Sequence, residues 1–308
     1  MCEAHGEKSA GSQLRAAEVR ASDAAARPAR AIANPARMVP LGIIHYCRLL
    51  VDGKARPAIV RADRCYLLAS DPITDGGAPV RISRDSIAAH EARLLAPVRP
   101  RTVLAIGDNY PLPLAGRWIS HPVPGLYLKP PGAIIDPGAQ IVLPVGPGVA
   151  QAEGSMVVVI GRRGKHISEA DAGAHVFGIT CGNDISERIW QRADLQWARA
   201  RGADGFGPIG PVIAAGLDTS DLTIKTRING RIAQRGSTAD MHNSVATIIA
   251  KISRTMTLEP GDVIFTGSPG ATPTIKPGDT VEVEIEGVGV LRNRIAWAAA
   301  QPRAVLRA

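Results

Sequence analysis

Glycine and proline interrupt this chain so often that short strands and turns are favoured over long helices. Glycine occurs 32 times and proline 24 times among 308 residues, and both residue types favour turns. Hydrophobic residues make up 45% of the chain but aromatic residues only 4%, so Ala, Val, Ile and Leu must form most of the core. No apolar run reaches the roughly 18 residues that a membrane-spanning helix needs. The composition therefore predicts a β-rich protein of the α+β class, with no membrane partner.

The first 40 residues differ from the rest of the chain. Residues 1–40 are rich in Ala, Arg and Ser and lack apolar periodicity, so we expect a disordered N-terminal arm. They contain no apolar stretch of the roughly 7–15 residues that a secretory signal requires. Two alternatives stay open: translation from Met38, and an organellar transit peptide, which four acidic residues oppose (Glu3, Glu7, Glu18 and Asp23).

Residues 41–97 predict a small N-terminal β module. Turn residues separate three strand-like stretches, at 43–46, 58–60 and 66–68. A short helix is expected from Ser86 to Leu95, and the segment Pro97-Val98-Arg99-Pro100 is typical of a linker. The larger domain then spans residues 98–302.

That larger domain shows the pattern of strands, turns and a few helices. Its strand candidates have an apolar or β-branched bias and lie at 126–128, 140–145, 156–160 and 176–180. Period-two alternation around Asn229-Gly230 predicts a β-hairpin. Helices are expected after Ser168, over 185–192, and from a cap at Asn243 or Ser244 through Ile252.

The positive charge of the chain does not by itself indicate nucleic-acid binding. The formal net charge is +8, but Lys and Arg are mostly scattered, with only Arg162, Arg163 and Lys165 forming a small cluster. No nucleic-acid-binding motif accompanies them. An anionic small-molecule substrate fits the same charge.

The four cysteines predict neither a disulfide framework nor a zinc site. Cys2, Cys47, Cys65 and Cys181 stand far apart, without a Cys-x-x-Cys pair or His at metal spacing. We expect reduced, mostly buried thiols in a cytoplasmic protein. A Cys47–Cys65 pairing across two strands is an open alternative.

Two carboxylates flank the predicted strands of the larger domain. Glu153 precedes the strand at 156–160, and Asp184 follows the strand at 176–180. If these strands are neighbours, the carboxylates can meet at one pocket and hold Mg²⁺. On a helix, Arg188 and Gln191 would share a face with Asp184 and suit a carboxylate-bearing ligand. The alternative is an ordinary helix cap at Asp184 with a salt bridge to Arg188.

From residue 127 onwards, a series of short motifs follows along the chain. They are Tyr127–Gly132, Ala152–Gly154, Val157–Gly161, Phe177–Ser186, Gln196-Trp197, Asp204–Phe206, Gly210-Pro211, Asn229-Gly230, Thr238–Met241, Leu258–Val263, Phe265–Pro269, Val281–Gly287 and Leu291–Asn293. In these motifs and their order the chain resembles the fumarylacetoacetate hydrolase family, over roughly residues 100–295.

The resemblance implies a fold, a chemistry and a set of site residues. The fold would be a β-roll core with a small N-terminal β module, usually as a homodimer. The substrates would be 2-oxo acids or 1,3-dicarbonyl compounds, with Mg²⁺ (or Mn²⁺/Ca²⁺) holding the enolate. By analogy, the metal would lie on Glu153, Ser155 and Asp184. Substrate would contact Arg188, Gln191, Lys129, Thr266 and Ser268, and Arg201 would carry enolate charge.

The sequence departs from the family pattern at three places. Ser155 replaces the second carboxylate of the Glu-x-Glu metal motif, so it is either a weak ligand or a plain strand residue. Hydrolytic members carry a His and a Glu in the lid after Asn109-Tyr110; that dyad is absent, and His121 is either a substitute or a solvated loop residue. Arg201 replaces a family lysine, so it can stabilise negative charge but cannot donate a proton.

Some assignments keep a simpler alternative. Arg201 and Lys129 would form surface ion pairs, and Thr266 and Ser268 would cap turns.

These features predict a divalent-metal enzyme that decarboxylates, isomerises or hydrolyses a 2-oxo acid or 1,3-dicarbonyl substrate. Lyase or isomerase chemistry is favoured over hydrolysis, because it needs enolate stabilisation more than an activated water. The alternative function is a non-catalytic or metal-independent protein of the same fold, either a pseudoenzyme or a biosynthetic scaffold.

Overall fold

The structure is a computed structural model that describes residues 42–75, 81–111, 113–114, 117–118, 125–144 and 148–298. The expected N-terminal arm, and His121 of the lid, lie outside the described residues. All described residues belong to one unit of the fold, Pro40–Ala308. Its secondary structure is mainly β with few helices, as the composition predicts.

The N-terminal strands are consecutive antiparallel neighbours. β1 (Ile44–Val51), β2 (Lys54–Arg61), β3 (Arg64–Leu68) and β4 (Ile82–Ala88) pair in chain order, and β5 (Leu94–Leu95) pairs with β1. β1 also pairs with β15 (Ile209–Ala215), so these strands extend the sheet that the later residues form. Whether residues 41–97 constitute a separate domain stays a prediction.

The prediction of a helix from Ser86 to Leu95 is wrong. Cys65 and Tyr66 of β3 pair with Ile87 and Ser86, which extends this segment as part of β4. Helix propensity is a weak preference, and strand pairing in the tertiary structure overrides it here.

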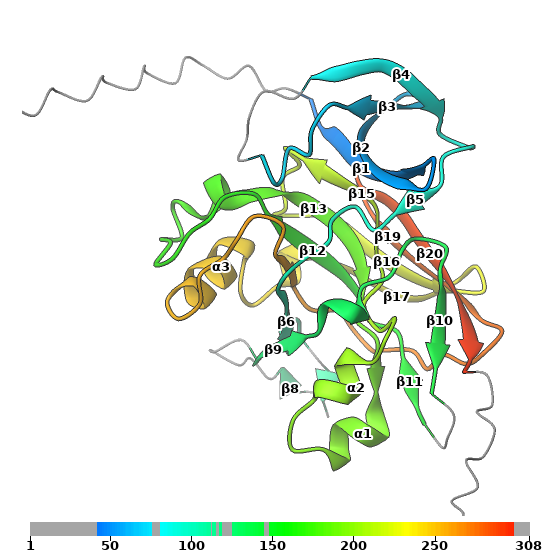
Figure 1. Ribbon diagram of the computed structural model, residues 1–308. Helices are drawn as coiled ribbons and strands as arrows, with labels where there is room; N and C mark the ends of the chain where they lie inside the picture. Colours follow the sequence, from blue (N-terminus) through cyan, green and yellow to red (C-terminus); the bar gives the residue numbers. More distant parts are fainter. Residues whose placement is uncertain are drawn as a thin grey trace, which may run out of the picture. The chain divides into compact units, whose positions relative to one another are not determined.

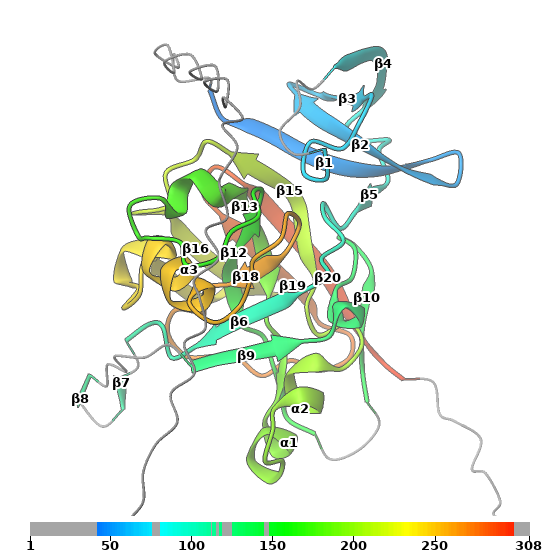
Figure 2. The same ribbon diagram turned by 60° about the vertical axis from the view of Figure 1, so that its left-hand side comes forward.

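Among the described residues, the largest sheet has eleven strands, in the order β4-β3-β2-β1-β15-β13-β12-β18-β6-β9, with β5 beside β1. Its later strands are β6 (Val103–Gly107), β9 (Gly125–Lys129), β12 (Gly154–Ile160), β13 (Val176–Asn183) and β18 (Val263–Phe265). Figure 2 shows β6 and β9 side by side below β18.

A second sheet of the described chain has the order β10-β20-β19-β16-β17. Its strands are β10 (Gln140–Leu143), β16 (Thr223–Ile228), β17 (Arg231–Ser237), β19 (Thr280–Ile285) and β20 (Gly289–Trp297). The turn between β16 and β17 is Asn229-Gly230, both with positive φ, which confirms the predicted hairpin. Two short ribbons pair β11 (Ala150–Gln151) with β14 (Ser186–Glu187) and β7 (Pro113–Leu114) with β8 (Arg117–Trp118).

The described helices are short. They are α1 (Arg188–Ala193), α2 (Ala198–Gly202) and α3 (Val245–Ser253), with 3-10 turns η1 (Pro131–Ala133), η2 (Ala172–His175) and η3 (Thr238–Asp240). Ser244 caps α3, as expected. The segment after Ser168 forms only the 3-10 turn η2. No helix in the described ranges is long and apolar enough to cross a membrane.

The core is built around β12, which is buried along its whole length. Met156 and Val158 pack into one hydrophobic cluster and Val157 and Val159 into another. Since alternate side chains of a strand point to opposite faces, both faces of the sheet are covered here. The buried strands β12 and β13 therefore hold whatever lies at their ends firmly in place. Beyond one end of them lie α1 and α2 (Figure 1).

The described cysteines are free thiols. Cys47, Cys65 and Cys181 are all buried and none forms a disulfide. This agrees with the expectation of reduced, buried cysteines, and the Cys47–Cys65 disulfide is not formed.

Candidate functional site

Glu153 and Asp184 meet at the ends of two paired strands. Gly154 of β12 lies opposite Asn183 of β13 in an antiparallel register. The Asp184 backbone N–H donates to the Glu153 carbonyl at 2.9 Å. The expectation that these strands are neighbours and bring the two carboxylates together is confirmed.

Gly154 allows this end of β12 to approach the second sheet closely. A Cβ at this position would lie 2.1 Å from Thr226 Oγ1 of β16. The Gly154 N–H donates to Gln234 Oε1 of β17 at 3.2 Å. The absence of a side chain therefore sets the position of Glu153 relative to both sheets.

Both oxygens of the Glu153 carboxylate have hydrogen-bond or ion-pair partners. Oε1 accepts from Ser186 Oγ at 2.7 Å and from Arg188 Nη2 at 2.9 Å. Oε2 lies 2.8 Å from Arg201 Nη1. Glu153 is thus paired with two guanidinium groups.

Asp184 is paired with two cations as well. Its Oδ1 lies 2.7 Å from Lys129 Nζ, and its Oδ2 lies 3.4 Å from Arg201 Nη1 and accepts from the Tyr127 hydroxyl. Burial raises the pKa of Asp184, but the charges of Lys129 and Arg201 outweigh burial and hold the pKa below its ordinary value. Asp184 is therefore a carboxylate at neutral pH.

Arg201 lies between the two carboxylates. Its guanidinium carbon is 5.1 Å from the centre of the Tyr127 ring and 5.8 Å from that of Trp197, which adds cation–π attraction. Burial lowers the pKa of Arg201, but Asp184 and Glu153 outweigh this and raise it above its ordinary value. Its Nε is buried and has no hydrogen-bond partner among the described residues.

Lys129 lies behind this group, at the end of β9. Its ammonium contacts Asp184 and donates to the backbone carbonyls of Arg201 and, at 3.1 Å, Phe206. Burial lowers the pKa of Lys129, and Asp184 opposes that shift. These internal partners surround its ammonium, so the structure gives Lys129 a place beneath the site rather than on its surface.

Arg188 and Gln191 lie on one face of α1, as expected. Arg188 Nη1 donates to Gln191 Oε1 at 2.6 Å and Nη2 to Thr272 Oγ1 at 2.9 Å, and Nε donates to Gln151. The helix begins at Arg188, later than the sequence predicts.

Asp184 does not cap α1. That role belongs to Glu187, whose carboxylate accepts from the N–H groups of Ile189 and Trp190. The alternative interpretation of Asp184 as a helix cap is therefore wrong. The extended chain from Asp184 to Glu187 explains the difference, because β14 pairs with β11 there.

A cavity of about 370 Å³ opens beside Glu153, while Asp184 is buried and does not line it. Five predicted site residues line it: Glu153, Arg188, Gln191, Arg201 and Ser268. The remaining lining residues are Ile106, Gly107, Asp108, Asn109, Tyr110, Trp197, Gly270, Ala271 and Thr272. The structure thus combines cationic, amide and hydroxyl groups with an aromatic wall in one place.

The predicted hydroxyl residues have separate positions. Ser155 is 0% exposed, and its Oγ donates to the Gly267 carbonyl at 2.6 Å. Thr266 is also buried and donates to the Met156 carbonyl. Ser268 lines the cavity, where its Oγ accepts from Gln234 at 2.9 Å.

Sequence reasoning missed Asp108, which also lines the cavity. It is exposed and has a φ of 54°, a left-handed conformation that non-glycine residues adopt uncommonly. The next residue is held rigidly, because the Asn109 amide donates to the Asn243 and Thr266 carbonyls and accepts from the Asn243 N–H. Asn109-Tyr110 marked the lid in the sequence, so its neighbour Asp108 could have been considered as a site residue from the sequence.

Trp197 and Tyr127 were missed as site residues too. Their rings meet edge to face at 5.5 Å between centroids and hold Arg201. Both belong to motifs of the family pattern, but a motif alone does not show which side chain an aromatic ring contacts.

The donor set does not fit the predicted divalent metal ion. Three cations, Lys129, Arg188 and Arg201, already pair with the two carboxylates. Ser155, at the third position, directs its hydroxyl to a carbonyl. No group of three His, Cys, Asp or Glu residues with metal-binding geometry occurs in the part of the chain that the structure describes. Mg²⁺, Mn²⁺ or Ca²⁺ on Glu153, Ser155 and Asp184 stays a prediction that this arrangement does not support.

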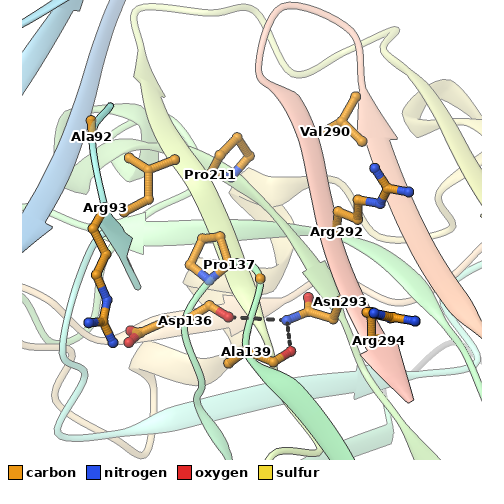
Figure 3. Close-up of a pocket in the computed structure, with 12 residues that line it drawn as sticks. Ala92, Arg93, Asp136, Pro137, Ala139, Pro211, Val290, Arg292, Asn293 and Arg294 are labelled. Atoms are coloured by element: carbon orange, nitrogen blue, oxygen red, sulfur yellow. Dashed lines mark hydrogen bonds between the residues drawn. The ribbon is translucent and has the colours of Figure 1, made fainter. Parts of the chain in front are cut away.

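A larger hollow of about 610 Å³ lies elsewhere and lacks this chemistry. Figure 3 shows Arg93, Pro137, Pro211, Arg292 and Arg294 around it, with Asn293 donating to the Asp136 and Ala139 carbonyls. None of the predicted site residues lines it. The smaller cavity, with its paired carboxylates and aromatic wall, is the candidate active site.

Residues 102–296 match the family model for the fumarylacetoacetate (FAA) hydrolase C-terminal domain. The chain is 41% identical over 211 residues to Protein Rv2993c of Mycobacterium tuberculosis, covering 67% of this chain and 79% of that protein. It is 35% identical over 244 residues to the human mitochondrial oxaloacetate tautomerase FAHD2A, covering 72% and 78%. Its fold matches the crystal structure of 2-hydroxyhepta-2,4-diene-1,7-dioate isomerase from Mycobacterium marinum with a TM-score of 0.77 and 34% identity, covering 83% and 99%.

Proposed function

This chain belongs to the fumarylacetoacetate hydrolase family, and from that premise we propose that it is an enzyme acting on a 2-oxo acid or 1,3-dicarbonyl anion. The reaction is isomerisation (keto–enol tautomerisation included) or decarboxylation, ahead of C–C bond hydrolysis. Relatives named as a tautomerase and an isomerase support this order. So does the sequence, because the His and Glu that activate water in hydrolytic members are missing after Asn109-Tyr110.

One observation carries the proposal: two guanidinium groups, Arg188 and Arg201, line the cavity. Lys129, Arg188 and Arg201 pair with Glu153 and Asp184, which leaves one positive charge in excess among these five groups; the further carboxylate at the cavity, Asp108, is exposed to solvent. Such fixed charges act strongly in a site that excludes water. A bound enolate would neutralise the excess.

Arg188 and Arg201 would bind the carboxylate and enolate oxygens of the substrate. Both line the cavity, and guanidinium groups recognise carboxylates in a planar, paired geometry. Because arginine stays protonated, these residues stabilise negative charge without transferring protons. Gln191 and Ser268 would orient the substrate, with Trp197 as its apolar wall.

Asp108 is our candidate for the proton acceptor. Two carboxylates line the cavity, Asp108 and Glu153, and both oxygens of Glu153 already accept from cations or a hydroxyl. Asp108 is exposed beside the cavity, on a backbone that its neighbour Asn109 holds in place. A base needs such access to the carbon acid of the substrate.

A panel of 2-oxo acids, followed by loss of enol absorbance, tests the proposed activity. We expect turnover by the natural sequence, a loss of kcat in Asp108→Asn with little change in KM, and a rise of KM in Arg188→Lys. Absence of turnover with every substrate, in a folded protein, would instead favour the pseudoenzyme or scaffold alternative.

We further propose that the enzyme works as a cytoplasmic homodimer and binds no nucleic acid. The family resemblance supports the dimer, and the three free buried thiols support a reducing compartment. Light scattering after gel filtration checks the first part, since a subunit of 32.3 kDa would give twice that mass as a dimer.

A further inference from the structure

We infer that the Arg201 guanidinium takes the place of a divalent cation between Glu153 and Asp184, so that the site binds its anionic ligand without metal. The choice of ligand rests on the proposed function. The statement about metal rests on the contacts of this chain alone, and the two are tested separately below.

The Arg201 guanidinium lies between the carboxylates of Glu153 and Asp184. Arg201 Nη1 lies 2.8 Å from Glu153 Oε2 and 3.4 Å from Asp184 Oδ2. A metal ion that bridges two carboxylates needs this same space, at about 2.0–2.6 Å from each oxygen for Mg²⁺ or Ca²⁺. The cation that joins the two acids in this structure is therefore already part of the chain.

The charges of Glu153 and Asp184 are already balanced by cations of the chain. With Arg188 on Glu153 and Lys129 on Asp184, each carboxylate has a cationic partner besides Arg201. A doubly charged ion would enter a group that already carries an excess of positive charge. Like charges at such distances repel strongly, and more so away from water.

The third carboxylate of the family's metal motif is absent from this chain. Ser155 stands where the family pattern has a carboxylate, and its hydroxyl donates to the Gly267 carbonyl at 2.6 Å. It is completely buried. Two departures in the sequence, Ser155 and Arg201, thus act in the same direction: one removes a negative charge, and the other supplies a broad, planar cation.

Two aromatic rings and the surrounding backbone hold Arg201 in place. Its guanidinium packs against the Tyr127 and Trp197 rings, and its carbonyl accepts from Lys129. The backbone of α2 also lies close to β9 and its following turn, because a Cβ at Gly202 would lie 2.5 Å from Pro130 Cδ. Moving the Arg201 side chain aside to admit a metal ion would break its ion pairs with both carboxylates and its contacts with both rings.

Arg201 remains accessible to a ligand, because it lines the cavity and is 5% exposed. A planar dicarboxylate or 2-oxo acid supplies acceptors of the right geometry.

Calorimetry with oxalate, a planar mimic of an enolised 2-oxo acid, tests the inference on the full chain. After chelator treatment we expect oxalate to bind, with a Kd that changes less than about twofold when Mg²⁺ is added. In a separate arm, Mn²⁺ is titrated without oxalate and followed by water proton relaxation. We expect no stoichiometric binding up to about 1 mM, the weak end of specific affinities.

Two outcomes overturn the inference: oxalate binding that needs Mg²⁺ or tightens about tenfold with it, and one-site Mn²⁺ binding. If oxalate binds under neither condition, the proposed ligand class fails while the Mn²⁺ arm still decides the question of metal. The two proposals therefore fail in distinguishable ways.

Variants at Arg201 and Arg199 identify the residue responsible. Arg201→Gln should weaken metal-free oxalate binding more than about tenfold. The matched control is Arg199→Gln on the same helix, since Arg199 is largely exposed and pairs with Asp194; its oxalate affinity should not change. If Arg201→Gln does not fold, Arg201→Lys serves instead, because lysine keeps the charge but replaces the planar guanidinium with a compact ammonium on a different stem. Unchanged affinity in the folded Arg201 variant contradicts the assignment.

Discussion

At the level of single residues, the charges around Asp184 decide how the protein responds to acid. This side chain is 2% exposed and paired with Lys129 and Arg201. Its pKa is held below the ordinary aspartate value of about 3.9. The lowered pKa therefore contributes stability that is fully present above about pH 4 and is lost as pH falls through the folded-state pKa.

We predict that in Asp184→Asn the free energy of unfolding falls less steeply as the pH is lowered below about 4. The variant lacks the group whose protonation destabilises the protein below about pH 4. It should also be less stable at pH 7, by roughly 3–5 kcal/mol, because Lys129 becomes a buried charge without its carboxylate. Urea unfolding from pH 3 to 7 measures both effects. A variant that loses stability with acid as steeply as the natural chain contradicts the assignment.

The thiols provide a second residue-scale prediction. Burial raises the pKa of Cys181 to about 12, and Cys47 and Cys65 are buried too. Because the thiolate is the reactive form, a Cys2→Ser variant should react with a disulfide reagent at pH 8 only after denaturation. Rapid release of one chromophore equivalent from the folded protein would show that a described cysteine is accessible.

At the level of elements, the close approach of β12 to β16 places Glu153. Gly154→Ala would put a methyl group 2.1 Å from Thr226 Oγ1, and a buried β-branched side chain cannot turn away freely. We expect a loss of roughly 1–3 kcal/mol in the free energy of unfolding from overpacking. Denaturant titration measures it.

Gly173→Ala in η2 is the control for Gly154→Ala. A Cβ at Gly173 meets nothing within 4 Å, so the change should stay within about 0.5 kcal/mol. Equal losses in the two variants would mean that the loss arises from glycine's backbone freedom and not from the contact between the sheets.

The elements also show where local sequence is informative. The hairpin at Asn229-Gly230 was predictable, since its turn needs two residues with positive φ and few residue types supply them. The segment from Ser86 to Leu95 was not, because pairing with β3 gives it its extended form. Likewise, Glu187 and not Asp184 caps α1. Because β14 pairs with β11, the chain is still extended there and the helix begins only at Arg188.

At the level of the whole molecule, the two arginines that line the cavity should make anion binding depend on salt. Raising NaCl from about 50 to 500 mM shortens the Debye length severalfold, so the Kd for oxalate should rise. The neutral analogue oxamide is the control, because it carries no charge to screen. A Kd for oxalate that does not change with salt would show that the cations contribute only hydrogen bonds.

The family and the mainly β fold were determined by the sequence alone, whereas the meeting of Glu153 with Asp184 was predicted only on the condition that their strands are neighbours, which the structure confirms. Turn residues, strand periodicity and the order of short motifs are local, and they carry this information without a structure. Only the tertiary structure decided what surrounds the two carboxylates. Lys129 and Arg201 come from β9 and α2, far from both acids along the chain. Electrostatic pairing depends on distance in space, and no spacing in the sequence reports it.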